Sequence, residues 1–303
     1  MSALVTQMRV GVLMGGLSSE REVSLNSGKG VFEALKGRGY NALAIDWAPG
    51  DNIASKLVSA EVEIVWNALH GTYGEDGSVQ GLLDCLAIPY TGAGVLASAL
   101  AMDKIMAKQI FRDRGVPTPK AIVATSAHEA KEIGVPCVVK PGADGSSVGV
   151  TIVREASEVG TAFALAAKGG SPVLVEEFID GAEVNVGILD DEILGSVEIR
   201  PATEFYDYQA KYQRSDTQYI VPPELPASAV DAAEAIALAA HVSLGVTAYS
   251  RVDLMIGANG RPTVLEVNTL PGMTATSLLP KIAAARGMDY AALCERILSL
   301  AVV

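Results

Sequence analysis

The chain has 303 residues, of which 50% are hydrophobic and 19% charged, and its formal net charge at pH 7 is -12. This apolar content excludes a mainly disordered protein, and the length suits two or three domains. An acidic chain repels nucleic acid and anionic membranes, so an anionic ligand needs a local cluster of cations. No apolar run reaches the roughly 18 residues of a membrane span. The three cysteines form no Cys-x-x-Cys pair, which argues against a disulfide framework or a thiolate zinc site and favours a cytoplasmic protein.

The N-terminal third alternates short apolar strands with helical segments. Arg9–Gly15 is an apolar run that ends in glycine, and Asn41–Asp46 and Val62–Asn67 repeat this pattern. Val23–Leu35 has helical spacing. Strands and helices that alternate in this way build a parallel sheet covered on both faces. We therefore predict an α/β domain with a doubly wound parallel sheet over residues 1–99.

The pattern changes near residue 100. Ala101–Arg114 is predicted as one helix that ends at Gly115. Short β-branched runs follow, with one helix near Glu155–Lys168 between them. This order predicts an α+β domain with a mainly antiparallel sheet over residues 100–179.

Residues 180–303 are predicted to form a third domain. It contains further strands, an alanine-rich helix over Ser228–Leu244 and a C-terminal helical tail. A polar, tyrosine-rich loop at 205–219 is long for a compact protein and is predicted to be a lid. A flexible insertion is the alternative.

A hairpin in this third domain is predicted to bring two acids together. Asn259-Gly260 favours a two-residue type I′ turn between two apolar runs. That turn sets Asp253 directly opposite Glu266, on one face of the sheet. Like charges in such a pair repel unless a cation lies between them.

The same register sets Arg251 opposite Asn268 on the face that carries the acids. The side chains predicted for the opposite, apolar face are Val252, Leu254, Ile256, Leu265 and Val267. Carboxylate and amide oxygens are ligands that suit Mg²⁺. The alternative is a solvent-facing edge ladder in which Arg251 neutralises one acid.

A glycine-rich loop at residues 138–149 joins two further apolar runs. Its glycines let backbone N–H groups approach a phosphate, its serines donate hydrogen bonds, and Lys140 supplies charge. The chain has no G-x-x-x-x-G-K-[ST] motif, and the loop precedes no helix, so neither a P-loop nor a Rossmann fold is predicted. Lys104 and Lys211 offer two further cations, which favours a phosphate lid over an ordinary flexible β-turn.

Two segments follow strands of the predicted parallel sheet and open on the same edge. Ser19 with Glu22 predicts a capping box, which places Glu20 in the first helical turn. The helix dipole alone accounts for a carboxylate at this position. The alternative is that Glu20 reaches over the edge where α/β proteins bind ligands. His70 follows Val62–Asn67 and is the histidine to which we assign a function.

Six motifs, in their order and spacing, resemble those of the D-alanine–D-alanine ligases of the ATP-grasp superfamily. They are HGTYGEDG, MDK, KPGADGSSVG, FYDYQAKY, SRVDLM and LEVNTLPGMT, and the resemblance runs from about Val10 to Leu300. It implies three domains, with ATP held between the central and C-terminal sheets, and two Mg²⁺ or Mn²⁺ ions. It also implies a homodimer that acts in the cytoplasm on ATP and D-alanine. The implied reaction converts one D-alanine to an acyl phosphate, which the amine of a second D-alanine attacks to give a peptidoglycan precursor.

The resemblance also implies a role for each matched residue. For catalysis it implies Glu20, Ser146, Tyr212, Arg251 and the backbone N–H of Gly272. For D-alanine binding it implies Glu20, His70, Arg251 and Ser277. For ATP it implies Lys104, Lys140, Ser146, Ser147, Glu176, Phe178, Ile179, Glu183 and Lys211. For the metal it implies Asp253, Glu266 and Asn268.

Three other functions fit parts of the sequence. D-Alanine–D-lactate ligases are close relatives, but they commonly carry phenylalanine where this chain has Tyr212, which favours the dipeptide. A non-catalytic nucleotide sensor on the same fold has no need of two metal carboxylates and an oxyanion arginine. A nicotinamide dehydrogenase is excluded because the first strand is not followed by a G-x-G-x-x-G turn.

Overall fold

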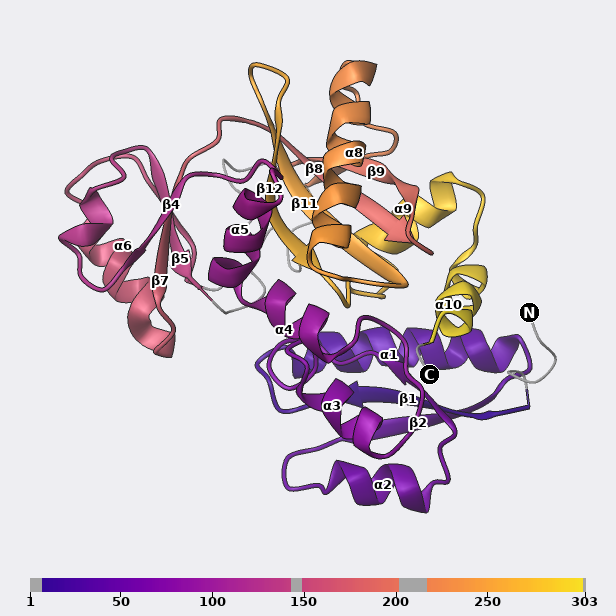
Figure 1. Cartoon of the computed structure of the whole chain (residues 1–303). Helices are drawn as coiled ribbons and strands as arrows, with labels where there is room; N and C mark the ends of the chain where they lie inside the picture. The colour runs from indigo at the N-terminus through magenta and orange to yellow at the C-terminus, as the bar shows by residue number, and fades with distance from the viewer. Residues whose placement is uncertain (1–6, 143–148, 202–216, 302–303) are drawn as a thin grey trace.

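The computed structural model describes residues 7–142, 149–201 and 217–301. These residues form three sheets with the strand orders β2-β1-β3, β4-β7-β5-β6 and β10-β9-β8-β11-β12. Figure 1 shows the first sheet below, the second at the left and the third above, with α4 and α5 running between them. The predicted combination of an α/β and an α+β architecture is confirmed.

The N-terminal sheet is parallel and covered on both faces. Its strands are β1 (Arg9–Gly15), β2 (Asn41–Trp47) and β3 (Ile64–Asn67), and its helices are α1 (Arg21–Gly37), α2 (Ile53–Ser59) and α3 (Ser78–Cys85). Side chains alternate along β1, so Val12 packs in one apolar cluster with α1 and Leu13 packs in another with α2 and α3. The C-terminal helix α10 (Tyr290–Ser299) joins the α1 cluster, which ties the end of the chain to its first domain.

The helix predicted over Ala101–Arg114 is instead two helices. They are α4 (Val95–Met102) and α5 (Lys104–Asp113). Asp103 separates them with extended backbone, and its carboxylate accepts hydrogen bonds from the N–H groups of Ile105 and Met106. Such an N-cap starts a new helix. Lys104 is therefore the first residue of α5, at the junction of the sheets.

The second sheet is antiparallel, as predicted. Its strands are β4 (Ala121–Ala124), β5 (Cys137–Pro141), β6 (Thr151–Val153) and β7 (Val173–Glu177). Helix α6 (Val159–Ala166) covers one face, with the short 3₁₀ helices η1 (Glu129–Lys131) and η2 (Ala167–Gly169). The β-branched side chains of these strands alternate inward and meet Ala162 of α6 in a small core of their own.

The third sheet carries the predicted acids. Its strands are β8 (Gly181–Leu189), β9 (Glu192–Arg200), β10 (Gln218–Ile220), β11 (Tyr249–Gly257) and β12 (Pro262–Asn268). The alanine-rich helix α8 (Ala227–Ser243) packs on one face, and α9 (Leu278–Ala285) packs on the other. Among the described residues, no helix has the length and apolar character needed to cross a bilayer.

The turn between β11 and β12 differs from the predicted type I′ turn. The N–H of Gly260 donates to the carbonyl of Gly257 at 2.8 Å, and the N–H of Gly257 donates to the carbonyl of Arg261 at 3.1 Å. The loop therefore has three residues and ends in Gly260, whose φ of 73° lies in the left-handed region that glycine tolerates. This turn alone would shift the register by one residue and place Asp253 opposite Leu265.

A β-bulge restores the predicted pairing. The register shifts between Asp253 and Leu254, so Leu265 is the additional residue of β12 and Asp253 faces Glu266. The prediction that Leu265 belongs to the apolar face is wrong. Because Leu265 is the bulge residue, Val264 packs in the core in its place. The opposition of the two acids is thus correct, although the turn predicted for it is wrong.

Candidate active site

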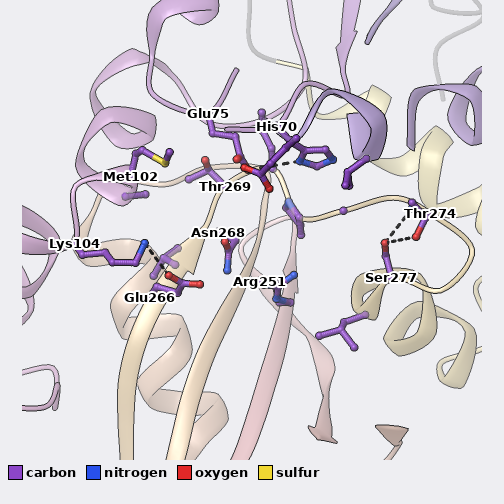
Figure 2. A pocket seen from close by; sticks show the side chains of 18 of the residues that line it. His70, Glu75, Met102, Lys104, Arg251, Glu266, Asn268, Thr269, Thr274 and Ser277 are labelled. Atoms are coloured by element: carbon purple, nitrogen blue, oxygen red, sulfur yellow. Dashed lines mark hydrogen bonds and ion pairs between the residues drawn. The ribbon is translucent and has the colours of Figure 1, made fainter. Parts of the chain in front are cut away.

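A pocket lies where the N-terminal domain meets the third sheet (Figure 2). Its walls come from the start of α1, the segment after β3, the α4–α5 junction, β11 and β12, and the segment between β12 and α9. The pocket brings together eight of the predicted site residues, which are Glu20, His70, Lys104, Arg251, Glu266, Asn268, Gly272 and Ser277. Segments distant in sequence therefore meet at one place.

Asp253 is buried and held by its neighbours on the hairpin. The Arg251 guanidinium donates from Nε to Oδ1 of Asp253 at 2.7 Å and from Nη2 to Oδ2 at 2.9 Å. The Asn268 amide donates to Oδ2 at 3.3 Å. Arg251 thus neutralises one acid, as the alternative interpretation stated, but Asp253 is only 5% exposed, which excludes a solvent-facing ladder. Two-pronged pairing of this kind fixes both side chains.

Glu266, the opposing acid, pairs with a lysine from another element. Its Oε2 lies 3.1 Å from Nζ of Lys104 at the start of α5, and Figure 2 shows the two side chains pointing toward each other. Burial lowers the pKa of Lys104, but Glu266, together with the negative charges of Glu176 and Glu75, outweighs this effect and the net shift is upward. Lys104 therefore carries its positive charge beside the acid pair.

Asn185 is a buried polar neighbour of the acid pair that the sequence did not reveal. It lies on β8 directly beside Asp253 and is 1% exposed. Its Nδ2 has no hydrogen-bond partner within the described ranges, which is unusual for a buried amide. The signal that could have found it is strand pairing, because alternation in β8 places Asn185 on the face of the acids once the β8–β11 register is known.

His70 lies in the segment after β3 and is buried against α1. Its Nε2 lies 3.3 Å from Oγ of Ser27, and its Nδ1 lies 3.8 Å from Oε1 of Glu75. Burial lowers the pKa of His70, but hydrogen bonding and charge from Glu75, with a contribution from Glu20, raise it overall. The sequence reasoning missed Glu75, although it stands in the same glycine-rich motif.

Glu20 takes the N-cap position of α1, and the predicted capping box is wrong. The hydroxyl of Ser18, not of Ser19, accepts the N–H of Glu20 at 3.2 Å and donates to the carbonyl of His70 at 2.6 Å. A Cβ at Gly71 would lie 2.7 Å from Oε2 of Glu20, and the φ of Gly71 is 68°. The segment after β3 therefore passes close to the Glu20 carboxylate, and a glycine makes this approach possible.

The segment between β12 and α9 presents backbone and hydroxyl groups to the pocket. Ser277 Oγ accepts the N–H of Thr274 at 3.0 Å, and a Cβ on Gly272 would lie 2.9 Å from that oxygen. Met273 is held at both ends of its backbone. Its N–H donates to Ser27 Oγ at 3.3 Å, and its carbonyl accepts the hydroxyl of Tyr290 at 2.6 Å. Gly272 and Ser277 are thus fixed next to each other.

The residues predicted for ATP form a second group on the central sheet. Glu176 is 1% exposed, and its Oε2 lies 2.8 Å from Nζ of Lys140. Its Oε1 lies 2.9 Å from Nζ of Lys108, which the sequence reasoning did not single out. Each oxygen of Glu176 therefore lies within ion-pair distance of a lysine ammonium.

The other described residues predicted to bind ATP lie between the end of β7 and the start of β8, or on β8 itself. Phe178 and Ile179 lie between β7 and β8, and Glu183 lies on β8, in register with Met255. The guanidinium of Arg154 lies 5.3 Å from the centre of the Phe178 ring. Four predicted residues lie outside the described ranges, as does the predicted lid up to residue 216, and they are Ser146, Ser147, Lys211 and Tyr212.

Comparison with known proteins matches two parts of the chain to the two domains of one protein family. Residues 47–93 match the family described as D-ala D-ala ligase N-terminus, and residues 109–299 match D-ala D-ala ligase C-terminus. A D-alanine–D-alanine ligase from Geobacter sulfurreducens is 50% identical over 295 residues, which cover 96% of this chain and 93% of the relative.

Similar solved structures belong to the same family. A D-alanine–D-alanine ligase from Bacillus anthracis has a TM-score of 0.86 and 40% identity, covering 97% of each chain. Another structure, of the ligase from the same organism complexed with ATP, has a TM-score of 0.84 and 37% identity, again covering 97% of each chain. The matched segments, the identity and the shared fold give one conclusion: the chain belongs to the D-alanine–D-alanine ligase family, with the ATP-grasp fold.

Proposed function

We propose that this chain joins two molecules of D-alanine to D-alanyl-D-alanine and converts ATP to ADP and phosphate, supplying peptidoglycan synthesis. One observation carries the proposal. A single pocket holds Lys104 and Glu266 at one end and Gly272 and Ser277 at the other, and Asn268 and Arg251, which face each other across the hairpin, lie between them. The first end suits a nucleotide's phosphates with a metal, and the second suits carboxylates. The relatives named above are D-alanine–D-alanine ligases, which does not favour the D-lactate alternative.

For ATP, we assign Lys140 and Lys104 to the phosphates, together with Lys211 and the loop containing Ser146 and Ser147. The residues that we assign to the adenine and ribose pocket are Glu176, Phe178, Ile179 and Glu183. Positioning and charge are the main contributions that a protein makes to phosphoryl transfer.

For the metal, we assign Asp253, Glu266 and Asn268 to Mg²⁺ or Mn²⁺. Their carboxylate and amide oxygens are the hard ligands that Mg²⁺ prefers. The Asn268 amide joins the two carboxylates in this assignment because it lies on the same hairpin, with Nδ2 3.3 Å from Oδ2 of Asp253. When bound, the ions neutralise charge on the phosphate oxygens.

For D-alanine, the charges of the pocket divide the two subsites. The Glu20 carboxylate suits the ammonium of the first D-alanine. Arg251 and the backbone N–H of Gly272 suit the oxyanion of a tetrahedral intermediate. Ser277, with Arg251, suits the carboxylate of the second D-alanine, and His70 lies nearby. Tyr212 and Ser146 are assigned to a hydrogen-bonded network between lid and Glu20.

The proposed organisation follows the family. We propose three domains over residues 1–99, 100–179 and 180–303, a lid at 205–219, and a homodimer in the cytoplasm. Residue 99 falls within α4, so this helix crosses the first boundary. Sedimentation of the full chain at several concentrations measures the oligomeric state.

The direct test is the release of ADP with each enantiomer of alanine. We expect D-alanine to stimulate ADP release and to yield the dipeptide by mass spectrometry, and L-alanine to do neither. ADP release that does not depend on D-alanine would reject the proposal.

A further inference from the structure

Lys108 is a buried lysine to which the proposed function gives no task. It lies on α5 and is 1% exposed. Burial of an ammonium is costly unless its charge and its hydrogen bonds are fully satisfied. Its surroundings therefore decide what it does.

The ammonium of Lys108 has three oxygen partners. It donates to Oγ1 of Thr118 at 2.6 Å and to the carbonyl of Pro119 at 3.2 Å, and it forms an ion pair with Oε1 of Glu176 at 2.9 Å. The ammonium has three N–H donors, of which two make these hydrogen bonds, and the ion pair with Glu176 compensates its charge. Within the described residues, Oε1 of Glu176 accepts no hydrogen bond. Two partners belong to the segment between α5 and β4, and the third belongs to β7 of the central sheet.

Through Thr118 and Glu176, Lys108 is connected to the third sheet and to the central sheet. The Thr118 hydroxyl donates to the carbonyl of Val264 at 3.0 Å, and the N–H of Val264 donates to the carbonyl of Pro117 at 2.8 Å. Val264 lies on β12, two residues before the proposed metal ligand Glu266. On the other side, Oε2 of Glu176 holds the Lys140 ammonium at 2.8 Å. One continuous polar chain thus joins the metal-binding strand to the phosphate-binding lysine.

The charge of this cluster favours an anion. Two lysines share one carboxylate, so a positive charge remains. Burial lowers the pKa of Lys108 to about 8, with Lys140 and Arg112 acting in the same direction and Glu176 opposing them. Lys108 is therefore still mainly protonated at neutral pH, and the excess charge stands beside the lysine proposed to contact phosphate.

We propose that Lys108 is a positioning residue for ATP, which fixes Glu176, and through it Lys140, relative to strand β12. The inference rests on the proposed function, which assigns Lys140 to the phosphates. It predicts that loss of the Lys108 contacts weakens ATP binding and leaves the D-alanine subsites intact, since Lys108, Thr118 and Glu176 do not line the pocket that holds Glu20, Gly272 and Ser277.

The test compares four variants of the full chain with the wild type. They are Lys108→Met, Thr118→Val, Thr118→Ser and the exposed control Lys131→Met. The measurements are the Kd for ATP by calorimetry, kcat, the KM for each substrate and the thermal unfolding temperature. Hydrogen bonds to charged groups contribute enough for Lys108→Met to raise the Kd for ATP about tenfold and Thr118→Val about threefold. The KM for D-alanine should stay within about twofold, Thr118→Ser should restore binding, and Lys131→Met should match the wild type.

Three results would overturn the inference. The first is a wild-type Kd for ATP in folded Lys108→Met or Thr118→Val. The second is an equal loss for ATP and D-alanine that follows unfolding temperature alone. The third is a Thr118→Ser variant as weak as Thr118→Val. If Lys108→Met does not fold, the two Thr118 variants decide. Failure of the proposed function is distinct, because it appears as wild-type protein that releases no ADP with D-alanine.

Discussion

Replacing Glu266 with glutamine removes one charge of the acid pair and keeps its shape. Two unit charges 3.1 Å apart, the separation of Glu266 and Lys104, attract by about 5 kcal/mol at an effective dielectric constant of 20. Desolvation of both groups offsets most of this, which leaves about 1–3 kcal/mol net. Glutamine is also a weaker ligand for Mg²⁺ than a carboxylate. Because the charge matters most as phosphoryl transfer proceeds, we expect kcat to fall at least about a hundredfold, with ATP binding surviving in part.

The assay is steady-state ADP release over a range of Mg²⁺ concentrations, with Kd for ATP measured in parallel. The matched control is Glu192→Gln, which makes the same chemical change at an exposed position. We expect Glu266→Gln to require more Mg²⁺ and the control to behave as wild type. Full activity of Glu266→Gln at saturating Mg²⁺ would remove Glu266 from the ligand set and refute the reasoning.

Three further changes test other parts of the site. Tyr290→Phe removes the hydroxyl that holds the Met273 carbonyl, so kcat should fall about two- to tenfold with the KM for ATP unchanged; an unchanged kcat would show that this clamp does not position Gly272. Because the pKa of His70 is raised, its contribution to stability is complete below about pH 6.5 and is lost as pH rises through the folded pKa. The unfolding temperature of His70→Gln should therefore approach that of the wild type as pH increases, and a gap that does not change with pH would contradict this. Tyr212→Phe should raise depsipeptide formation relative to dipeptide when D-lactate competes with D-alanine, and an unchanged product ratio would count against a role for this hydroxyl.

The sequence predicted the parts of the fold that depend on local pattern. Strand and helix periodicity located the parallel sheet around β1 and the antiparallel central sheet, because burial on alternate faces leaves a repeating pattern. The helix break at Asp103 was missed, because an N-cap within an apolar helical pattern resembles an ordinary surface position. The prediction that Asp253 faces Glu266 was correct, but the two-residue turn assumed for it was not. The three-residue turn shifts the strand register by one residue, and the bulge at Leu265 shifts it back.

Residues that act through tertiary contacts were not predictable from one sequence. Lys108 stands on a helix where a lysine is normally exposed, and its burial depends on how Glu176 and Thr118 approach it. Asn185 gains its position from the pairing of β8 with β11, which no local pattern specifies. Glu75 lies in a quoted motif, but only the folded loop brings it to His70. Spatial proximity, not residue type, separates these side chains from ordinary polar residues.

The central claim is that Asp253, Glu266 and Asn268 hold divalent metal against the phosphates of the nucleotide. A crystal structure of the full chain with ADP, Mg²⁺ and a phosphinate analogue of the tetrahedral intermediate measures this directly. We expect Mg²⁺ to be bound by oxygens of all three side chains and by the nucleotide, and Arg251 and the N–H of Gly272 to contact the analogue. Nucleotide and analogue bound elsewhere, or Mg²⁺ that contacts neither acid, would contradict it.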